Sequence, residues 1–289
     1  MPPVPQLVSA EWLAERLDEE DLRVLDATVW LRIDPDGGGA SVESGRASWE
    51  AEHIPGSAFA DLIEDLSDNT SGLPFTRPSA RAFAEAASRL GVGEGTRVVV
   101  YDADHGAWAT RLWWLLRSFG FDDAGVLDGG LTAWKAEGRP LTSQPAPPRP
   151  PARFVPAPRE ELVADREAVR AAMRDGGACL VNALPAPLFS GEVAVAPGRA
   201  GRIPGSVGVP AGELVDPQTT RCLSPESLRE RFAAAGALRD EPIVAYCGGG
   251  IAATADAFAL SLIGRDDVAV YDGSLVEWVS DPEAPLETG

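Results

Sequence analysis

The sequence predicts an α/β protein built from two similar domains, each with a mainly parallel sheet flanked by helices. Two observations predict this fold. Three short blocks occur twice in the same order, roughly 145 residues apart. Each half also alternates short apolar runs with stretches of helical composition, which is typical of buried parallel strands joined by helices.

The repeated blocks are an Ile-Pro-Gly-Ser segment, a strand that ends in tyrosine, and an Asp-Gly pair followed by leucine and tryptophan. They occupy 53–57, 98–102 and 127–134 in the first half, and 202–206, 243–247 and 271–278 in the second. Chance matches do not keep their order over three blocks. We infer a gene duplication that produced two related domains.

The expected elements follow the same order in both halves. In the first half we expect strands at 23–27, 97–101 and 125–127 and helices at 80–90 and 108–119. In the second half we expect strands at 178–182, 242–246 and 268–271 and helices at 226–235 and 252–263. Ser224 followed by Pro225 is typical of a helix start, with serine as the cap and proline in the first position.

The segment between the halves, residues 140–160, contains eight prolines. Proline fixes φ and removes the amide donor, so this segment is expected to be neither a helix nor a central strand. We expect a stiff, extended linker between a first domain, 1–139, and a second domain, 161–289.

The bulk composition excludes several classes of protein. The net charge of −19 disfavours nucleic acid and anionic membranes as partners. Three cysteines without Cys-x-x-Cys spacing disfavour a disulfide framework and a structural zinc site. The chain has no long apolar run, and its first residues do not resemble a signal peptide, so we expect a cytoplasmic protein.

The segment that carries chemistry is the loop after the expected strand 242–246. The strand leads into Cys247, three glycines follow, and a helix then begins. Ligands of parallel sheets collect beyond the carboxyl ends of the strands, and a helix start favours negative charge there. We expect Cys247 to be a thiolate nucleophile, held in a cradle formed by Gly248, Gly249, Gly250, Ile251 and Ala252.

Two other functions for this loop fail on the residues. A cysteine phosphatase needs arginine six positions after the cysteine, and that position is Ala253. A nucleotide-binding loop needs Gly-Lys-Ser/Thr after the glycines, and none follows. We therefore expect no cofactor and no metal. A glycine-rich turn that follows a merely structural cysteine stays open as an alternative.

In the order of its blocks the chain resembles the rhodanese family, and its tandem arrangement is similar to that of thiosulfate and 3-mercaptopyruvate sulfurtransferases. The resemblance implies a sulfurtransferase whose second domain carries the catalytic cysteine. It implies that a small anionic donor leaves a persulfide on Cys247, and that a thiol or cyanide accepts the sulfur. The first domain is then inactive, because Asp102 stands where the second domain has Cys247.

The chain departs from the family pattern around the expected site. Leu184 and Leu188 stand where the family has substrate-binding arginines, and Phe75 stands where it has a histidine. Asp61, the acid associated with that histidine, remains, while Gly249 and Ala252 replace a serine and a threonine. These departures keep a second hypothesis open, a rhodanese-like binding or regulatory module with weak or no transferase activity.

Other polar residues receive weaker functional expectations. Arg199 and Arg202 are candidate contributors to the cleft, since they follow the leucine positions and would supply the missing charge. We expect His53 and His105 to be structural, and Cys179 to be inert packing within a strand. Cys222 falls in a loop, where exposure is expected.

Overall fold

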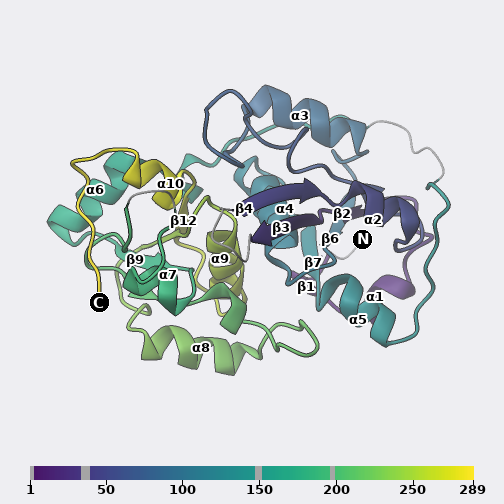
Figure 1. The fold of residues 1–289 in the computed structure, drawn as a ribbon. Coiled ribbons are helices and arrows are strands. Elements are labelled where there is room, and N and C mark those ends of the chain that lie inside the picture. Colours follow the sequence, from purple (N-terminus) through teal and green to yellow (C-terminus); the bar gives the residue numbers. More distant parts are fainter. Residues whose placement is uncertain (1–2, 34–39, 147–151, 196–198) are drawn as a thin grey trace. The chain divides into compact units, whose positions relative to one another are not determined.

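Figure 1 shows the computed structural model of the chain, in which residues 3–33, 40–146, 152–195 and 199–289 are described. The chain divides into two compact units by its internal contacts. Unit 1 comprises Met1–Asp68, Arg77–Pro158 and Gln218–Arg221, and unit 2 comprises Asn69–Thr76, Arg159–Pro217 and Cys222–Gly289. Each unit therefore includes a short segment from the other half of the sequence.

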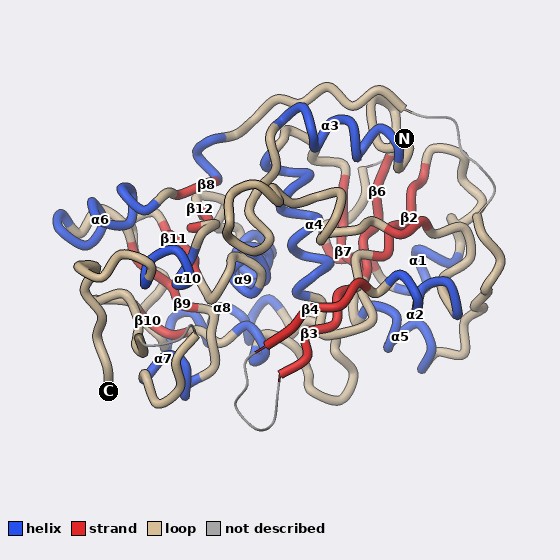
Figure 2. The backbone as a smooth tube through the Cα atoms, turned by 45° about the horizontal axis from the view of Figure 1, so that its top comes forward, coloured by secondary structure: helices blue, strands red, loops and turns tan. Residues whose placement is uncertain are grey.

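Unit 1 contains a parallel sheet with the strand order β1-β7-β6-β2-β5, coloured red in Figure 2. Its strands are β1 (Leu7–Val8), β2 (Leu22–Asp26), β5 (Ala58–Phe59), β6 (Arg97–Tyr101) and β7 (Ala124–Leu127). Its helices are α1 (Ala10–Ala14), α2 (Arg46–Ala51), α3 (Ala80–Arg89), α4 (Ala107–Ser118) and α5 (Gly130–Ala136). The central strands are fully buried, and α4 packs on β6 and β7.

Unit 2 repeats this sheet strand for strand, in the order β10-β9-β11-β12-β8. Its strands are β8 (Val163–Ala164), β9 (Cys179–Asn182), β10 (Val207–Gly208), β11 (Ile243–Tyr246) and β12 (Val268–Tyr271). Its helices are α6 (Arg166–Asp175), α7 (Ala186–Ser190), α8 (Pro225–Ala234), α9 (Ala252–Leu262) and α10 (Ser274–Val279), with 3-10 turns η1 (Glu160–Leu162) and η2 (Ala211–Glu213). The predicted α/β fold with two mainly parallel sheets is confirmed.

Both copies of the repeated blocks make the same contacts. The tyrosine at the end of the central strand bonds through its hydroxyl to the serine of the Ile-Pro-Gly-Ser block. The distances are 3.0 Å for Tyr101 and Ser57 and 2.6 Å for Tyr246 and Ser206. These blocks therefore recur because each one fastens the same loop to the same strand end.

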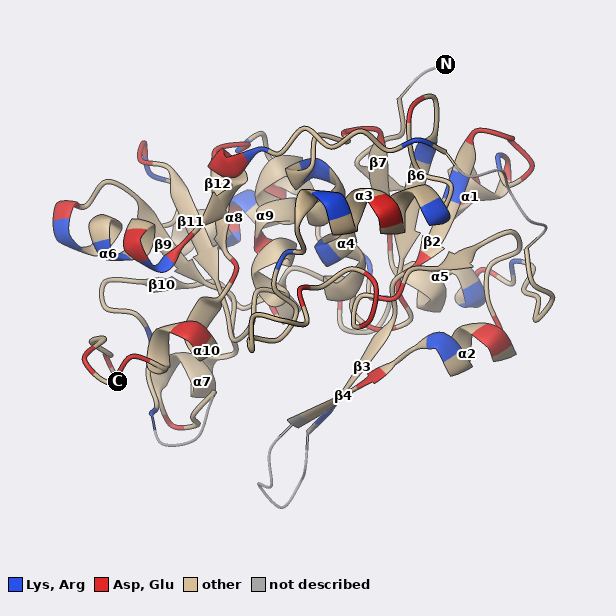
Figure 3. Cartoon of the chain, turned by 90° about the horizontal axis from the view of Figure 1, so that it is seen from above, with Lys and Arg blue, Asp and Glu red and all other residues tan. Residues whose placement is uncertain are grey.

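An antiparallel hairpin of unit 1, formed by β3 (Val29–Ile33) and β4 (Ala40–Ser44), was not predicted. Figure 3 shows it projecting from the sheet and helices of its unit. Leu31 and Val42 pair across it and are 51% and 41% exposed. The hairpin was missed because its first strand follows β2 after only two residues, so the two strands were not separated in the sequence pattern.

The end of the proline-rich segment is fixed to unit 1. The Glu94 amide donates to the Arg153 carbonyl, the Phe154 amide to the Ser88 hydroxyl, and the Ala157 amide to the Phe119 carbonyl. Phe154 is buried and stacks edge-on against Phe83. Residues 147–151 of the predicted linker lie outside the described residues.

Candidate active site

Cys247 lies where the sequence predicts it, directly after β11 at the carboxyl edge of the unit 2 sheet. Its side chain is buried, with 2% exposed. Gly248, Gly249, Ile251 and Ala252 are half-buried, so the loop surface is more accessible than the sulfur beneath it. The eleven-residue helix α9 begins at Ala252, and its N-terminal end directs positive potential toward this loop.

The glycines of the loop have identifiable physical roles. Gly250 has a φ of 80°, a conformation that residues with a side chain rarely adopt. A Cβ atom on Gly248 would lie 3.2 Å from Val195 Cγ1, and one on Gly249 would lie 3.3 Å from Pro74 Cγ. The loop therefore turns tightly between Val195 and Pro74, which form apolar walls beside it.

Ser274, the first residue of α10, contacts Cys247 directly. Its hydroxyl accepts a hydrogen bond from the Cys247 amide at 3.1 Å and lies 4.0 Å from Cys247 Sγ. It also donates to the Tyr271 carbonyl at 2.7 Å, and this shorter distance favours the carbonyl as its acceptor. Ser274 is fully buried with a φ of 50°, an uncommon conformation for a residue with a side chain.

Sequence reasoning did not single out Ser274, although a signal for it was present. The first repeat has Gly130 at the matching position, with a φ of 52°. Serine at a position whose backbone suits glycine is strained, and such strain is typically retained at functional sites. The exchange of Gly130 for Ser274 between the two Asp-Gly blocks was therefore the informative difference.

The two leucine positions lie along the strand next to Cys247. Asn182 pairs with Tyr246 in the register of β9 and β11, and the Ala183 amide donates to the Tyr246 carbonyl at 2.9 Å. Leu184 follows at once, is buried, and donates its amide to Asn182 Oδ1 at 2.8 Å. Leu188 is half-buried on the short helix α7. Apolar side chains therefore stand at this edge where the resemblance implies arginines.

Phe75 and Asp61 fall in different units. Phe75 belongs to unit 2 with the Cys247 loop, next to Pro74, which borders Gly249. Its φ of 56° is a strained conformation for an aromatic residue. Asp61 belongs to unit 1, where its carboxylate accepts from the Ile63 and Glu64 amides and the Ser44 hydroxyl.

Arg199 and Arg202 both bond to the C-terminal segment of unit 2. Arg199 donates to the carbonyls of Asp281 and Ala284. Arg202 donates to the Gly289 carbonyl at 2.8 Å and forms an ion pair with Glu287. Their guanidinium groups therefore hold residues 281–289 in place, which leaves less of their charge for an anionic ligand.

The remaining candidates have structural partners. His53 stacks on Trp49, and both of its ring nitrogens face backbone carbonyls, those of Trp49 and Gln144. His105 is largely exposed and pairs with its neighbour Asp104. Burial raises the pKa of the Cys179 thiol, which disfavours its reactive thiolate form. Cys222 is half-buried.

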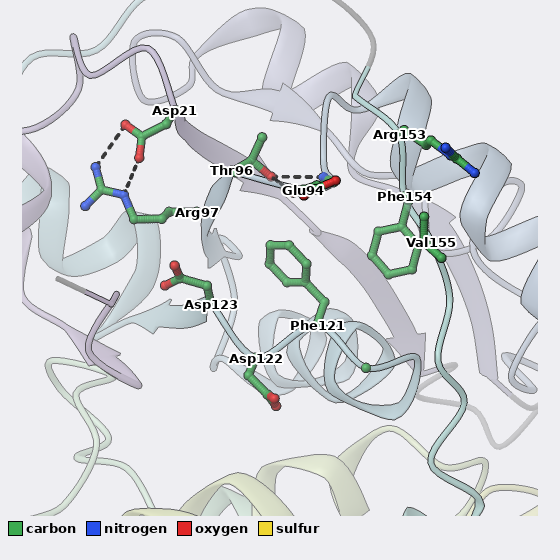
Figure 4. A pocket seen from close by; sticks show the side chains of 13 residues that line it. Asp21, Glu94, Thr96, Arg97, Phe121, Asp122, Asp123, Arg153, Phe154 and Val155 are labelled. Atoms are coloured by element: carbon green, nitrogen blue, oxygen red, sulfur yellow. Dashed lines mark hydrogen bonds and ion pairs between the residues drawn. The ribbon is translucent and has the colours of Figure 1, made fainter. Parts of the chain in front are cut away.

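A pocket of about 580 Å³ lies in unit 1, at the edge of its sheet where the strands begin (Figure 4). It is lined by residues at the starts of the strands, including Asp21, Arg97 and Asp123, together with Phe121 and Phe154. Ligands of parallel sheets bind at the carboxyl edge, so this pocket is not the counterpart of the Cys247 site. Among the residues that the structure describes, no three acidic, histidine or cysteine side chains are grouped so that they could hold a metal ion. No helix in the same ranges is long and apolar enough to span a bilayer.

Two regions of the chain, residues 9–137 and 165–281, match the family model described as a rhodanese-like domain. A Pseudomonas aeruginosa protein named as a probable 3-mercaptopyruvate sulfurtransferase is 39% identical over 98% of this chain and 98% of its own length. The human 3-mercaptopyruvate sulfurtransferase is 38% identical, over 98% of this chain and 95% of its own length.

A solved structure is similar over the same extent. The 3-mercaptopyruvate sulfotransferase SseA from Escherichia coli superimposes with a TM-score of 0.81 and 33% identity, over 94% of this chain and 99% of that chain. The resemblance seen in the sequence blocks therefore extends to the fold.

Proposed function

Because this chain belongs to the rhodanese family, we propose that it is a sulfurtransferase in which Cys247 carries the transferred sulfur. The supporting observation is the position of Cys247, at the end of β11, before a glycine loop and the start of α9. Gly248, Gly249, Gly250, Ile251 and Ala252 form the cradle in this proposal. The second domain, 161–289, is catalytic and the first, 1–139, is not.

The reaction proceeds in two balanced steps. The Cys247 thiolate attacks the sulfur of a small donor, a new S–S bond forms, and the electron pair of the broken bond leaves with the rest of the donor. A thiol or cyanide then attacks the outer sulfur, and Cys247 leaves as the thiolate. No oxidant or cofactor is required, and the kinetics are ping-pong.

The donor is of the 3-mercaptopyruvate or thiosulfate type. The relatives named above are 3-mercaptopyruvate sulfurtransferases and cover nearly the whole chain, which supports this class. Leu184 and Leu188 set this site apart, because a charge-assisted hydrogen bond from a guanidinium contributes about 1.5–3 kcal/mol to anion binding. We infer that this site captures an anionic donor through the loop amides rather than through arginines.

A donor panel with thiocyanate or sulfide readout tests the function, using the wild type and Leu184→Arg/Leu188→Arg. We expect turnover by the wild type, and a roughly hundred- to ten-thousand-fold higher kcat/KM for the anionic donor in the double variant. Leu184→Met/Leu188→Met is the matched control, since it changes shape without adding charge. Absence of turnover in the wild type and in the arginine variant alike would instead favour a binding or regulatory module.

A further inference from the structure

The loop of unit 1 that matches the Cys247 loop is already occupied by an anion, the side chain of Asp102. Asp102 follows β6 as Cys247 follows β11, and it is fully buried. Its Oδ1 atom accepts from the Asp104 amide at 2.9 Å and the Gly106 amide at 3.0 Å. Its Oδ2 atom accepts from the Ala109 amide at 2.8 Å, in the first turn of α4.

These three partners are all donors, so they suit an ionised carboxylate. Burial raises the pKa of Asp102, while the three backbone N–H groups act in the opposite direction. The three N–H groups thus offset part of the cost of holding a negative charge out of water. A loop that does this for a carboxylate is arranged to hold a small anion.

The two loops match in their backbone contacts as well as in their position. The carbonyl of Asp102 accepts from the Leu131 amide at 2.9 Å, and that of Cys247 accepts from the Leu275 amide at 3.1 Å. Gly106 and Gly250 have φ values of 85° and 80°. Thr110 and Thr254 each donate a hydroxyl to the carbonyl three residues earlier. The loop of unit 2 is one residue shorter, since Thr254 lies seven positions after Cys247 and Thr110 lies eight after Asp102. Matched at the two threonines, Gly250 and Ala253 correspond to the donors Gly106 and Ala109.

An aspartate side chain also has the connectivity of a persulfide. In both groups one atom follows Cβ, and the charged terminal atom follows next, so the carboxylate oxygens take the place of the outer sulfur. We propose that Asp102 is a built-in substitute for a bound anion, and that it fills in unit 1 the amide cradle that unit 2 keeps for the persulfide of Cys247.

Two consequences follow for this protein. The first repeat retains a latent site for a small anion, closed by its own side chain. In the second repeat, the corresponding loop and the start of α9 hold the outer sulfur of the Cys247 persulfide. The second consequence rests on the proposed function, whereas the first does not.

Chemical rescue by formate, the equivalent of the missing carboxylate, tests the latent site. In a Cys247→Ser background, which prevents sulfur chemistry, Asp102→Ala should lower the melting temperature. Formate should restore it saturably, by about 3–6 °C at ten times its dissociation constant. Formamide, which is neutral, should not.

Leu112→Ala is the matched control, because Leu112 is buried in α4 and its removal opens space without exposing backbone donors. A formate effect no larger in Asp102→Ala than in Leu112→Ala would overturn the proposal. If Asp102→Ala does not fold, Asp102→Ser serves the same comparison. If formate rescues Asp102→Ala but the wild type takes up no sulfur from any donor, the latent anion site stands and the proposed sulfurtransferase function fails. If the wild type takes up sulfur but formate does not rescue Asp102→Ala, the function stands and the latent site fails.

Discussion

At the scale of single residues, the chemistry of the site rests on Cys247 and the groups that touch its backbone. The Cys247 amide is bound by the Ser274 hydroxyl, and its carbonyl by the Leu275 amide. Both contacts come from the start of α10, so this helix fixes the orientation of the cysteine. The first repeat keeps the carbonyl contact but has no hydroxyl, since Gly130 replaces the serine.

Ser274→Gly separates the role of this hydroxyl from that of the backbone. Glycine tolerates the φ of 50° without strain, so the loss of stability should be limited to about 1–3 kcal/mol, the cost of leaving the buried Cys247 amide without its acceptor. The rate of sulfur loading should fall by roughly two- to tenfold, as expected for one neutral hydrogen bond. Stopped-flow loading and thermal melts measure the two effects. A drop in melting temperature with an unchanged loading rate would show that the serine is only structural.

Asp26 makes the stability of unit 1 depend on pH. Burial raises the pKa of its carboxyl from an ordinary 3.8 to about 6, and the charge of Asp102 adds to the rise. A pKa that is higher in the folded state favours folding only while the carboxyl is protonated, so stability falls as pH rises from about 4 to about 6. Asp26 should account for at most about 3 kcal/mol of this decrease in the free energy of unfolding, and the Asp26→Asn variant should lack that contribution.

Urea unfolding of the wild type and Asp26→Asn across that pH range measures the difference. Asn retains an acceptor for the Thr28 amide, which donates to Asp26 Oδ1 at 2.9 Å. If the free energy of unfolding changed with pH in the same way in both proteins, the raised pKa of Asp26 would be contradicted.

At the scale of elements, α9 carries an unexplained acid. Asp256 is fully buried, and neither carboxylate oxygen has a hydrogen-bond partner in the described structure. Burial raises its pKa well above the ordinary value. The matching residue of α4 is Leu112, which is also buried. An apolar side chain therefore suits this helix position.

Asp256→Val should raise the free energy of unfolding by about 1–3 kcal/mol, since it removes a buried polar group without a partner. Asp256→Asn is the control, because it keeps the polarity and the volume. Calorimetric melts of the wild type and both variants measure the differences in stability. Equal stability of the valine variant and the wild type would mean that Asp256 has a compensating partner after all.

The segment that joins the repeats is a second element with a testable role. Phe154 packs in an aromatic cluster of unit 1 with Phe83 and Phe121. Phe154→Ala should destabilise unit 1 by about 3–5 kcal/mol, as for other buried aromatic residues. Val155→Ala is the control, because Val155 is 63% exposed and should cost less than about 0.5 kcal/mol. Similar unfolding midpoints for both variants would show that the segment is not fastened to unit 1.

Sequence patterns predicted the three central strands of each sheet and the helices α3, α4, α8 and α9, but not the ten-residue helix α6. Strand 268–271 and the start of the helix at 252 agree with the structure, because buried runs and glycine loops leave clear boundaries. The two-residue edge strands and the β3–β4 hairpin were not predicted. Edge strands this short have no periodicity of their own, and they form only where a longer strand offers them a partner.

At the scale of the whole molecule, the duplication is visible in the sequence, but the contacts that distinguish the two repeats are not. The repeated blocks predicted two related domains and placed Cys247 opposite Asp102. They did not predict that the Asp102 carboxylate is held by three amides, since a hydrogen bond to a loop amide depends on backbone direction. Nor did they predict that residues 69–76 belong with unit 2, because this depends on contacts distant in sequence.

The central claim is that Cys247 is the residue that takes up sulfur, and intact-mass spectrometry after incubation with 3-mercaptopyruvate or thiosulfate tests it most directly. We predict that the wild type and Cys222→Ser each gain one sulfur atom and lose it to an added thiol, whereas Cys247→Ser gains none. A wild type that gains no sulfur from either donor, or a Cys247→Ser variant that still gains one, would contradict the account.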